Sequence, residues 1–213
     1  MKITKFGQCC LLIEVAGKRV LTDPGVFSTT QNDLTNLDLI LITHEHGDHL
    51  HSESLQAILE KNPDAEVITN TSVGKVLTEM GVAFTVLEGR ASGTHADVLL
   101  EAFDGEHVEI IDDFGLVQNT GYFIAGELFY AGDAYTNPKK EVAILALPVA
   151  GPWCKLSDAI KYAREIKPAK AFPVHDYMLS AAGKKGTYGH VARELTAIGT
   201  EFIELKEDES AEF

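Results

Sequence analysis

Three histidines and one aspartate crowd into a short segment that directly follows an apolar run. The segment reads THEHGDH from Thr43 onward and contains His44, His46, Asp48 and His49. A loop at the end of a strand can aim alternate side chains at a common point, and imidazole nitrogen and carboxylate oxygen are ligands for Zn(II), Mn(II) or Fe(II). Four such groups exceed what one catalytic metal takes from a protein, which predicts ligands shared between two metals.

The elements that must position this segment alternate in a regular order. The apolar run Leu37–Thr43 is typical of a strand buried on both faces, with helices on at least one side. Two sheets face to face with helices outside would bury both halves of the chain in one core. Strands are expected at Lys2–Phe6, Cys9–Val15, Lys18–Thr22, Glu66–Thr69, Val82–Leu87, Val98–Phe103, His107–Ile111, Gly121–Ile124, Leu128–Tyr130, Val142–Leu147, Lys170–Val174 and Phe202–Leu205. Helices are expected from Ser52 to Lys61, from Thr71 to Met80, from Ser157 to Ile166 and over His190–Ile198.

The segment HEHGDH resembles the metal motif of the metallo-β-lactamase-fold hydrolases, and the resemblance extends across the whole chain. Asp23 in LTDPG, Asp133 in FYAGDA and His175 in AFPVHD match further positions of the family. Each follows an apolar strand, as convergence of all ligands at one edge of the sheets requires. The resemblance implies a four-layer αβ/βα sandwich, between the α+β and α/β classes. We expect one domain over residues 1–213, with an acidic, frayed tail at about 206–213.

The family also implies a histidine between the first motif and Asp133, and two residues compete for this position. His95 lies in SGTHAD, which superficially looks like the glycine-rich histidine loop of the family. His107 follows the turn residues Asp104-Gly105 and precedes the hairpin that leads to Asp133. That hairpin returns the chain to the same edge. The order of elements therefore favours His107 and leaves His95 in a loop or at the rim.

The resemblance implies two divalent metal ions, zinc in the first place and manganese or iron as alternatives. His44, His46 and His107 would hold the first, Asp48, His49 and His175 the second, and Asp133 would lie between them. Asp23 would fix a ligand by hydrogen bonding. A metal-bound hydroxide would attack the substrate, and Asp48 is the catalytic candidate for taking or returning a proton.

Several other residues have weaker claims to a place at the site. His190, Lys155 and Tyr177 are expected to contact substrate: His190 from the start of a helix, Lys155 from a loop, and Tyr177 because it closely follows His175. His51 is expected to be an exposed polar residue near the start of a helix.

The composition limits the classes of partner. The 213 residues carry 18 Lys and Arg against 32 Asp and Glu, a net charge of −14. This balance argues against a broad nucleic-acid or anionic-lipid surface. The chain shows neither a cleavable signal pattern nor a membrane-spanning run, and its three cysteines suggest no disulfide framework. We expect a cytoplasmic protein, and the sequence leaves homo-oligomer formation open.

Three functions are compatible with these patterns. The favoured one is hydrolysis of a small anionic ester or lactone, as in the minimal branch loosely similar to ascorbate-6-phosphate lactonase. The alternative is a phosphodiesterase or nuclease acting on a nucleotide-like substrate, and the third is a metal-binding module without turnover. The antibiotic-hydrolysing enzymes carry an arginine where this chain has His49, which disfavours β-lactam hydrolysis.

Overall fold

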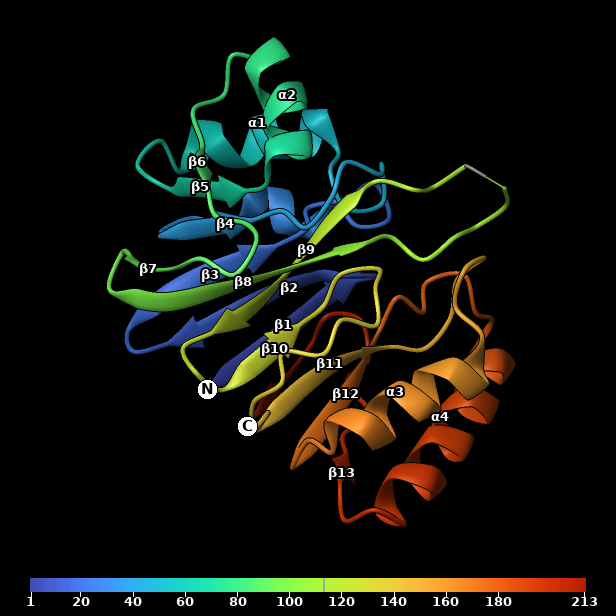
Figure 1. Ribbon diagram of the computed structural model, residues 1–213. Helices are drawn as coiled ribbons and strands as arrows, with labels where there is room; N and C mark the ends of the chain where they lie inside the picture. The colour runs from blue at the N-terminus through green and yellow to red at the C-terminus, as the bar shows by residue number, and fades with distance from the viewer. Residues whose placement is uncertain (113) are drawn as a thin grey trace.

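Two β-sheets packed face to face form the centre of the molecule, and helices cover the outer face of each sheet (Figure 1). The computed structural model describes residues 1–112 and 114–213, and within these residues each sheet has seven strands. The architecture is the four-layer αβ/βα sandwich that the sequence predicts.

The first sheet has the strand order β14-β1-β2-β3-β4-β5-β6, with parallel pairing from β3 to β6. Helices α1 and α2 lie against its outer face (Figure 1). Its strands are β1 (Lys2–Gly7), β2 (Cys10–Val15), β3 (Lys18–Thr22), β4 (Leu39–Leu41), β5 (Glu66–Thr69), β6 (Thr85–Val86) and β14 (Glu209–Glu212). The helices are α1 (Ser52–Lys61) and α2 (Thr71–Glu79), and a short 3-10 helix, η1, spans Thr30–Asp33.

The second sheet mirrors this arrangement, with the order β13-β12-β11-β10-β9-β8-β7 and parallel pairing from β10 to β13. Helices α3 (Leu156–Ile166) and α4 (Ala181–Thr196) cover its outer face (Figure 1). Its strands are β7 (Ser92–His95), β8 (Val98–Glu106), β9 (Gln118–Ile124), β10 (Leu128–Tyr130), β11 (Ile144–Pro148), β12 (Lys170–Val174) and β13 (Glu201–Phe202).

Apolar side chains fill both the space between the sheets and the spaces beneath the helices. Successive side chains of a strand point to opposite faces. Leu39 and Leu41 of β4 therefore pack between the sheets with Tyr122 and Tyr130, whereas Ile40 packs beneath α1 and α2. This two-sided burial explains why the run before the histidine segment is apolar throughout.

The turn expected at Asp104-Gly105 was a wrong prediction, and so was the strand over His107–Ile111. Strand β8 continues through both residues to Glu106, with Gly105 opposite Asn119. Gly105 serves close packing here, because a Cβ at this position would lie 2.6 Å from Oγ1 of Thr136. The connection from β8 to β9 is consequently long, and its described residues, 107–112 and 114–117, project from the molecule (Figure 1).

Two further predictions, both in the C-terminal part of the chain, were wrong. Helix α4 begins at Ala181, where the Ser180 side chain accepts a hydrogen bond from Gly183 N, so that His190 lies well inside the helix. Glycines in this helix concealed its start in the sequence. The acidic tail is not frayed: Glu209–Glu212 forms β14, which pairs with β1 in antiparallel register.

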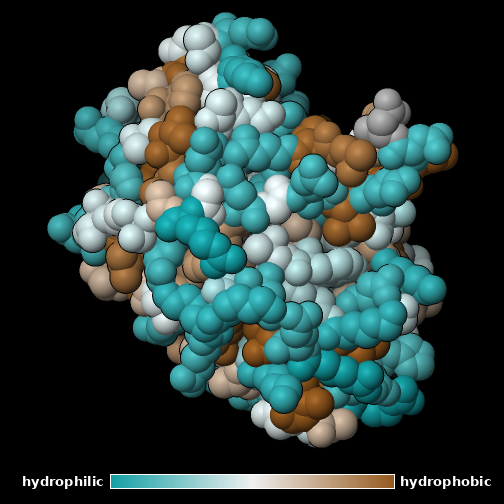
Figure 2. Space-filling model, viewed as in Figure 1, coloured by the Kyte–Doolittle hydropathy of each residue, from teal (hydrophilic) through white to brown (hydrophobic). Residues whose placement is uncertain are grey.

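The surface is largely hydrophilic on the face seen in Figure 2, and hydrophobic side chains gather around the loop between β8 and β9. Among the helices of residues 1–112 and 114–213, none joins the length and the apolar character that crossing a membrane requires.

Candidate metal centre

The histidine and aspartate side chains converge where strands from both sheets end. Asp23 follows β3, the segment from His44 to His49 follows β4, Asp133 follows β10 and His175 follows β12. These strands run parallel within their sheets, so their carboxyl ends meet at one edge. The backbone is tightly packed there: a Cβ on Gly25 would lie 1.8 Å from the carbonyl oxygen of Asp48. A glycine is therefore required directly after Asp23-Pro24.

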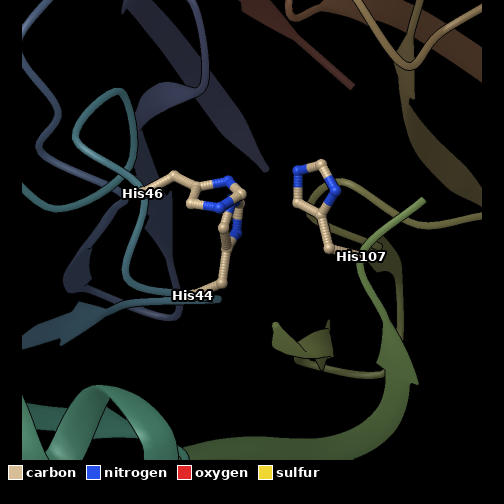
Figure 3. A group of neighbouring side chains, drawn as sticks. All are labelled: His44, His46 and His107. Carbon is tan, nitrogen blue, oxygen red and sulfur yellow. The ribbon is translucent and has the colours of Figure 1, made fainter. Parts of the chain in front are cut away.

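The first cluster consists of His44, His46 and His107, whose ligand atoms lie within 4.8 Å of one another. Figure 3 shows the rings of His44 and His46 facing that of His107, which comes from the loop after β8 in the other sheet. Two of the rings are fixed by contacts of Nδ1 on the side away from the cluster. His107 Nδ1 donates to Val108 O at 2.6 Å, and His44 Nδ1 lies 3.0 Å from Oγ1 of Thr43. These contacts leave the Nε2 lone pairs facing the cluster.

The second cluster consists of Asp48, His49, Asp133 and His175, and Asp133 links it to the first. His49 Nε2 lies 3.1 Å from Asp133 Oδ1, and His175 Nε2 lies 2.9 Å from Asp133 Oδ2. The same Oδ2 atom lies 3.2 Å from His107 Nε2 of the first cluster. The carboxylate of Asp133 therefore stands between two sets of ligands, as a bridging residue must.

Asp23 contacts the ligand segment without pointing into either cluster. Its Oδ2 accepts hydrogen bonds from Nδ1 of His49 at 2.7 Å and from Oγ1 of Thr43 at 2.8 Å, and its Oδ1 accepts from the Thr43 backbone N–H. The hydroxyl of Tyr130 also donates to this carboxylate. Asp23 thereby sets the tautomer and the orientation of His49.

The donor set fits metal ions, because polar atoms of the two clusters lack any other partner. Buried polar groups in proteins are almost always hydrogen-bonded. Among the described residues, however, Nε2 of His44, Nε2 of His49 and Oδ1 of Asp133 are buried without a hydrogen-bond partner. Each of these atoms faces the clusters. Neutral imidazole and carboxylate are the ligands that zinc, manganese and iron accept.

The charges of the clusters respond to burial and to one another. Burial lowers the pKa of His44 well below its ordinary value, and the neighbouring His49 adds to this effect. Burial alone would also lower the pKa of His49, but Asp133 and Asp23 outweigh it and raise that pKa well above the ordinary value. Although burial favours a neutral carboxyl, His175 and His49 hold the pKa of Asp133 well below its usual range. A bound metal ion would stabilise the ionised carboxylate of Asp133 in place of the imidazolium groups.

Gln8 is a site residue that no feature of the sequence indicated. It follows Gly7 at the break between β1 and β2. Its Nε2 donates to Oδ2 of Asp48 at 2.9 Å and lies 3.1 Å from Nε2 of His175, while its Oε1 accepts from the backbone N–H of Tyr177 at 3.1 Å. Gln8 therefore holds two residues of the second cluster in place. A glutamine has no characteristic spacing from metal ligands, so only its position in the fold reveals this contact.

Trp153 closes one side of the clusters. Its indole Nε1 donates to Oδ2 of Asp133 at 2.9 Å, and its ring packs edge-on against His107 and His175. It belongs to the loop between β11 and α3.

The structure separates the remaining sequence candidates from the clusters. His95 lies on β7 and contacts Oε1 of Glu66 at 3.0 Å, outside both groups of ligand atoms. The substrate contacts expected from His190 and Lys155 are corrected: His190 lies in a surface hollow between α3 and α4, and Lys155 is exposed ahead of α3. Tyr177 does lie near the rim, stacked on Phe27 with ring centroids 4.6 Å apart. His51 is half-buried and contacts Oγ of Ser54 at the start of α1.

Comparison with known proteins places the chain in a family. The chain belongs to the family described as the β-lactamase superfamily domain, which matches residues 2–175. Protein Rv0786c of Mycobacterium tuberculosis is 34% identical over 218 residues, covering 100% of both chains. A protein of Alkaliphilus metalliredigens named UPF0173 metal-dependent hydrolase is 30% identical over 194 residues, covering 82% of this chain and 85% of its own.

The fold also recurs in solved structures. Igni18, a metallo hydrolase from the archaeon Ignicoccus hospitalis, superposes with a TM-score of 0.78 over 100% of this chain and 98% of its own, at 20% identity. At that identity the likeness shows the fold alone. Together with the family match and the histidine–aspartate clusters, it places the chain among the metal-dependent hydrolases of the metallo-β-lactamase fold.

Proposed function

We propose that the chain uses two divalent cations to hydrolyse a small ester or lactone. The cations are zinc in the first place, with manganese or iron as alternatives. The meeting of the two clusters at Asp133 carries this proposal, because one carboxylate contacts His107 on one side and His49 and His175 on the other. The ligands would be His44, His46 and His107 for one cation and Asp48, His49 and His175 for the other, with Asp133 between them.

The two carboxylates of the clusters have different environments. When bound, paired cations of this kind supply a hydroxide nucleophile at neutral pH and polarise the substrate oxygen. Asp133 is 2% exposed and accepts a hydrogen bond from the indole N–H of Trp153. It is therefore fixed in place between the candidate ligands. Both carboxylates line the pocket, but the side chain of Asp48 is 22% exposed. Asp48 is therefore the carboxylate that can exchange a proton with the substrate or with solvent.

The charge of the centre suits the negative charge that develops on the carbonyl oxygen during hydrolysis of an ester or lactone. Two divalent cations outweigh the carboxylates of Asp48 and Asp133 even with a hydroxide present. A positive centre in a partly enclosed site attracts negative charge, although the whole protein has a net charge of −14.

The test begins with protein stripped by a chelator and then loaded with Zn²⁺ or Mn²⁺ separately. We expect about two metal ions per chain and hydrolysis of p-nitrophenyl acetate and γ-butyrolactone in preference to bis-p-nitrophenyl phosphate. Asp133→Asn should lose metal and activity, whereas Asp158→Asn on the surface of α3 should keep both.

Two outcomes would overturn the proposal. Preferential cleavage of the phosphodiester would instead support the phosphodiesterase alternative. Binding of two metals without turnover of either class would support a metal-binding module.

A further inference from the structure

The pocket in front of the candidate ligands has apolar walls. Its volume is about 230 Å³, and ligand residues together with Trp153 form its floor. Side chains from four separate loops form the walls: Val26 and Phe27 after β3, Ile110 after β8, Pro152 after β11 and Met178 after β12. Since these residues come from distant parts of the chain, the fold itself assembles an apolar mouth over a polar floor.

Within the described part of the chain, no lysine or arginine lines this pocket. Lys184 and Lys185, which are close to His175 in sequence, line a different hollow with Tyr188 and Lys206. Lys184 also forms an ion pair with Glu207, with 2.5 Å between Nζ and Oε1. The walls therefore contain no cation that could pair with an anionic group of the substrate far from the reacting carbon. Any negative charge of the substrate has to lie beside the metals.

The apolar side chains of the mouth remain exposed to water. Val26 is 46% exposed and Met178 is 66% exposed, and Tyr177, which stacks on Phe27, is 45% exposed. Ile111 and Phe114 are also exposed on the loop between β8 and β9, where Figure 2 shows hydrophobic surface. A soluble monomer exposes contiguous apolar surface mainly where it binds something. Val26, Phe27 and Met178 line the pocket that leads to the two clusters, so the group that they bind is part of the substrate.

We propose that the substrate is an ester or lactone with an uncharged, apolar acyl or alkyl group that lies against Val26, Phe27 and Met178. This inference rests on the proposed function and specifies its substrate class. The size of the pocket agrees with a short chain or a single ring, because a closed cavity of about 150 Å³ already holds benzene. The reacting carbonyl would lie at the polar floor, and the apolar group would fill the mouth.

A series of p-nitrophenyl esters tests the inference with the leaving group held constant. The acetate, butyrate and hexanoate differ only in chain length, and the hemisuccinate matches the butyrate in length but carries a distal carboxylate. We expect kcat/KM of the metal-loaded protein to rise about threefold per added methylene, as partial burial of each CH₂ predicts. We also expect the hemisuccinate to react at least tenfold more slowly than the butyrate. Equal rates along the series, or a preference for the hemisuccinate, would overturn the inference while leaving the proposed hydrolase intact.

Variants locate the effect at the mouth of the pocket. Met178→Ser should lower the ratio of kcat/KM for hexanoate over acetate by about threefold. Leu99→Ser is the matched control, because Leu99 is also an exposed apolar residue, at 45%, but lies on β8 outside the pocket. If the control lowers the ratio as much as Met178→Ser does, the apolar group does not bind at Met178.

Binding is measured independently of catalysis through Trp153, which is the only tryptophan of the chain. In metal-free protein, titration with hexan-1-ol should change the tryptophan emission at lower concentration than titration with butan-1-ol, by about tenfold. The tryptophan emission distinguishes failure of the proposed function from failure of the proposed apolar pocket. Protein that hydrolyses no ester but binds the alcohols in this order refutes the proposed function alone, whereas equal or absent responses to the alcohols refute the apolar pocket.

Discussion

His49 donates its Nδ1–H to Oδ2 of Asp23 at 2.7 Å, although 26 residues separate the two in sequence. Both side chains are completely buried. The contact joins the end of β3 to the loop after β4 and leaves Nε2 of His49 directed at Asp133. A carboxylate that holds a histidine in this way fixes the ring and makes it a better metal ligand.

Replacing Asp23 by asparagine should weaken metal binding about 10- to 100-fold, because the amide keeps the shape of the side chain but loses the charge that orients His49. The affinity is measured by competition with a chromogenic chelator. Asp64→Asn, in an exposed turn after α1, is the control and should bind metal normally. An unchanged affinity in Asp23→Asn would show that the contact does not support the metal.

The assignment of the third histidine can be tested with a pair of variants. His107→Ala should lower the metal content towards one ion per chain, because His107 Nε2 faces both His44 and Asp133. His95→Ala should leave the metal content unchanged, since His95 contacts Glu66 on the first sheet. Elemental analysis of both proteins after gel filtration gives the answer. The reverse pattern would mean that His95 supplies the ligand.

The stability of the metal-free protein should fall between about pH 6.5 and pH 9. Burial would lower the pKa of His175, but Asp133 and Asp48 outweigh it and raise the pKa to about 9. A raised folded-state pKa contributes stability that is fully present below the unfolded value of about 6.5 and is lost as the pH rises through 9. The loss is up to about 3 kcal/mol for this one group. Urea unfolding in the presence of a chelator at several pH values measures it.

The matched variant for this pH dependence is His175→Asn, which removes the titrating group. The slope of unfolding free energy against pH should become smaller in that protein. A slope that is unchanged by the substitution would assign the effect to another group. Metal affinity should rise over the same range, because a bound cation has to displace the proton from His175.

Removal of one partner from a buried ion pair behind His175 should strongly destabilise the protein. Lys5 Nζ donates to Oδ1 of Asp176 at 2.7 Å and to Pro173 O at 3.0 Å, and neither charged side chain is exposed. Lys5→Met leaves the Asp176 charge without its closest cation in the interior and should cost about 3–5 kcal/mol.

The free energy of unfolding is again measured with urea, and the double variant Lys5→Met with Asp176→Leu should recover part of the loss. Lys139→Met removes one partner of the surface pair Lys139–Glu165 and should change stability by less than about 1 kcal/mol. A small effect of Lys5→Met would indicate that the hydroxyl of Tyr188, which donates to Oδ2 of Asp176, compensates for the missing cation.

The sequence by itself determined the ligand motif and the two-sheet architecture. The segment from His44 to His49 has a composition that an ordinary loop does not need, and the apolar run before it indicates a strand buried on both faces. Asp23, Asp133 and His175 each follow an apolar strand, and strand ends meet at a sheet edge. The strands were inferred from local patterns, which short-range periodicity and turn residues record directly, whereas the choice of Asp23, Asp133 and His175 came from the resemblance to the family.

The tertiary structure decided everything that depends on which distant loops meet. It directed His107 toward His44 and placed His95 beside Glu66, although both histidines precede Asp133 in the chain. It brought Gln8 to Asp48, and it moved His190 away from the site because α4 begins earlier than its glycines suggest. It also assembled the apolar pocket mouth from four loops. Such contacts arise from the packing of whole sheets, and no spacing within the sequence encodes them.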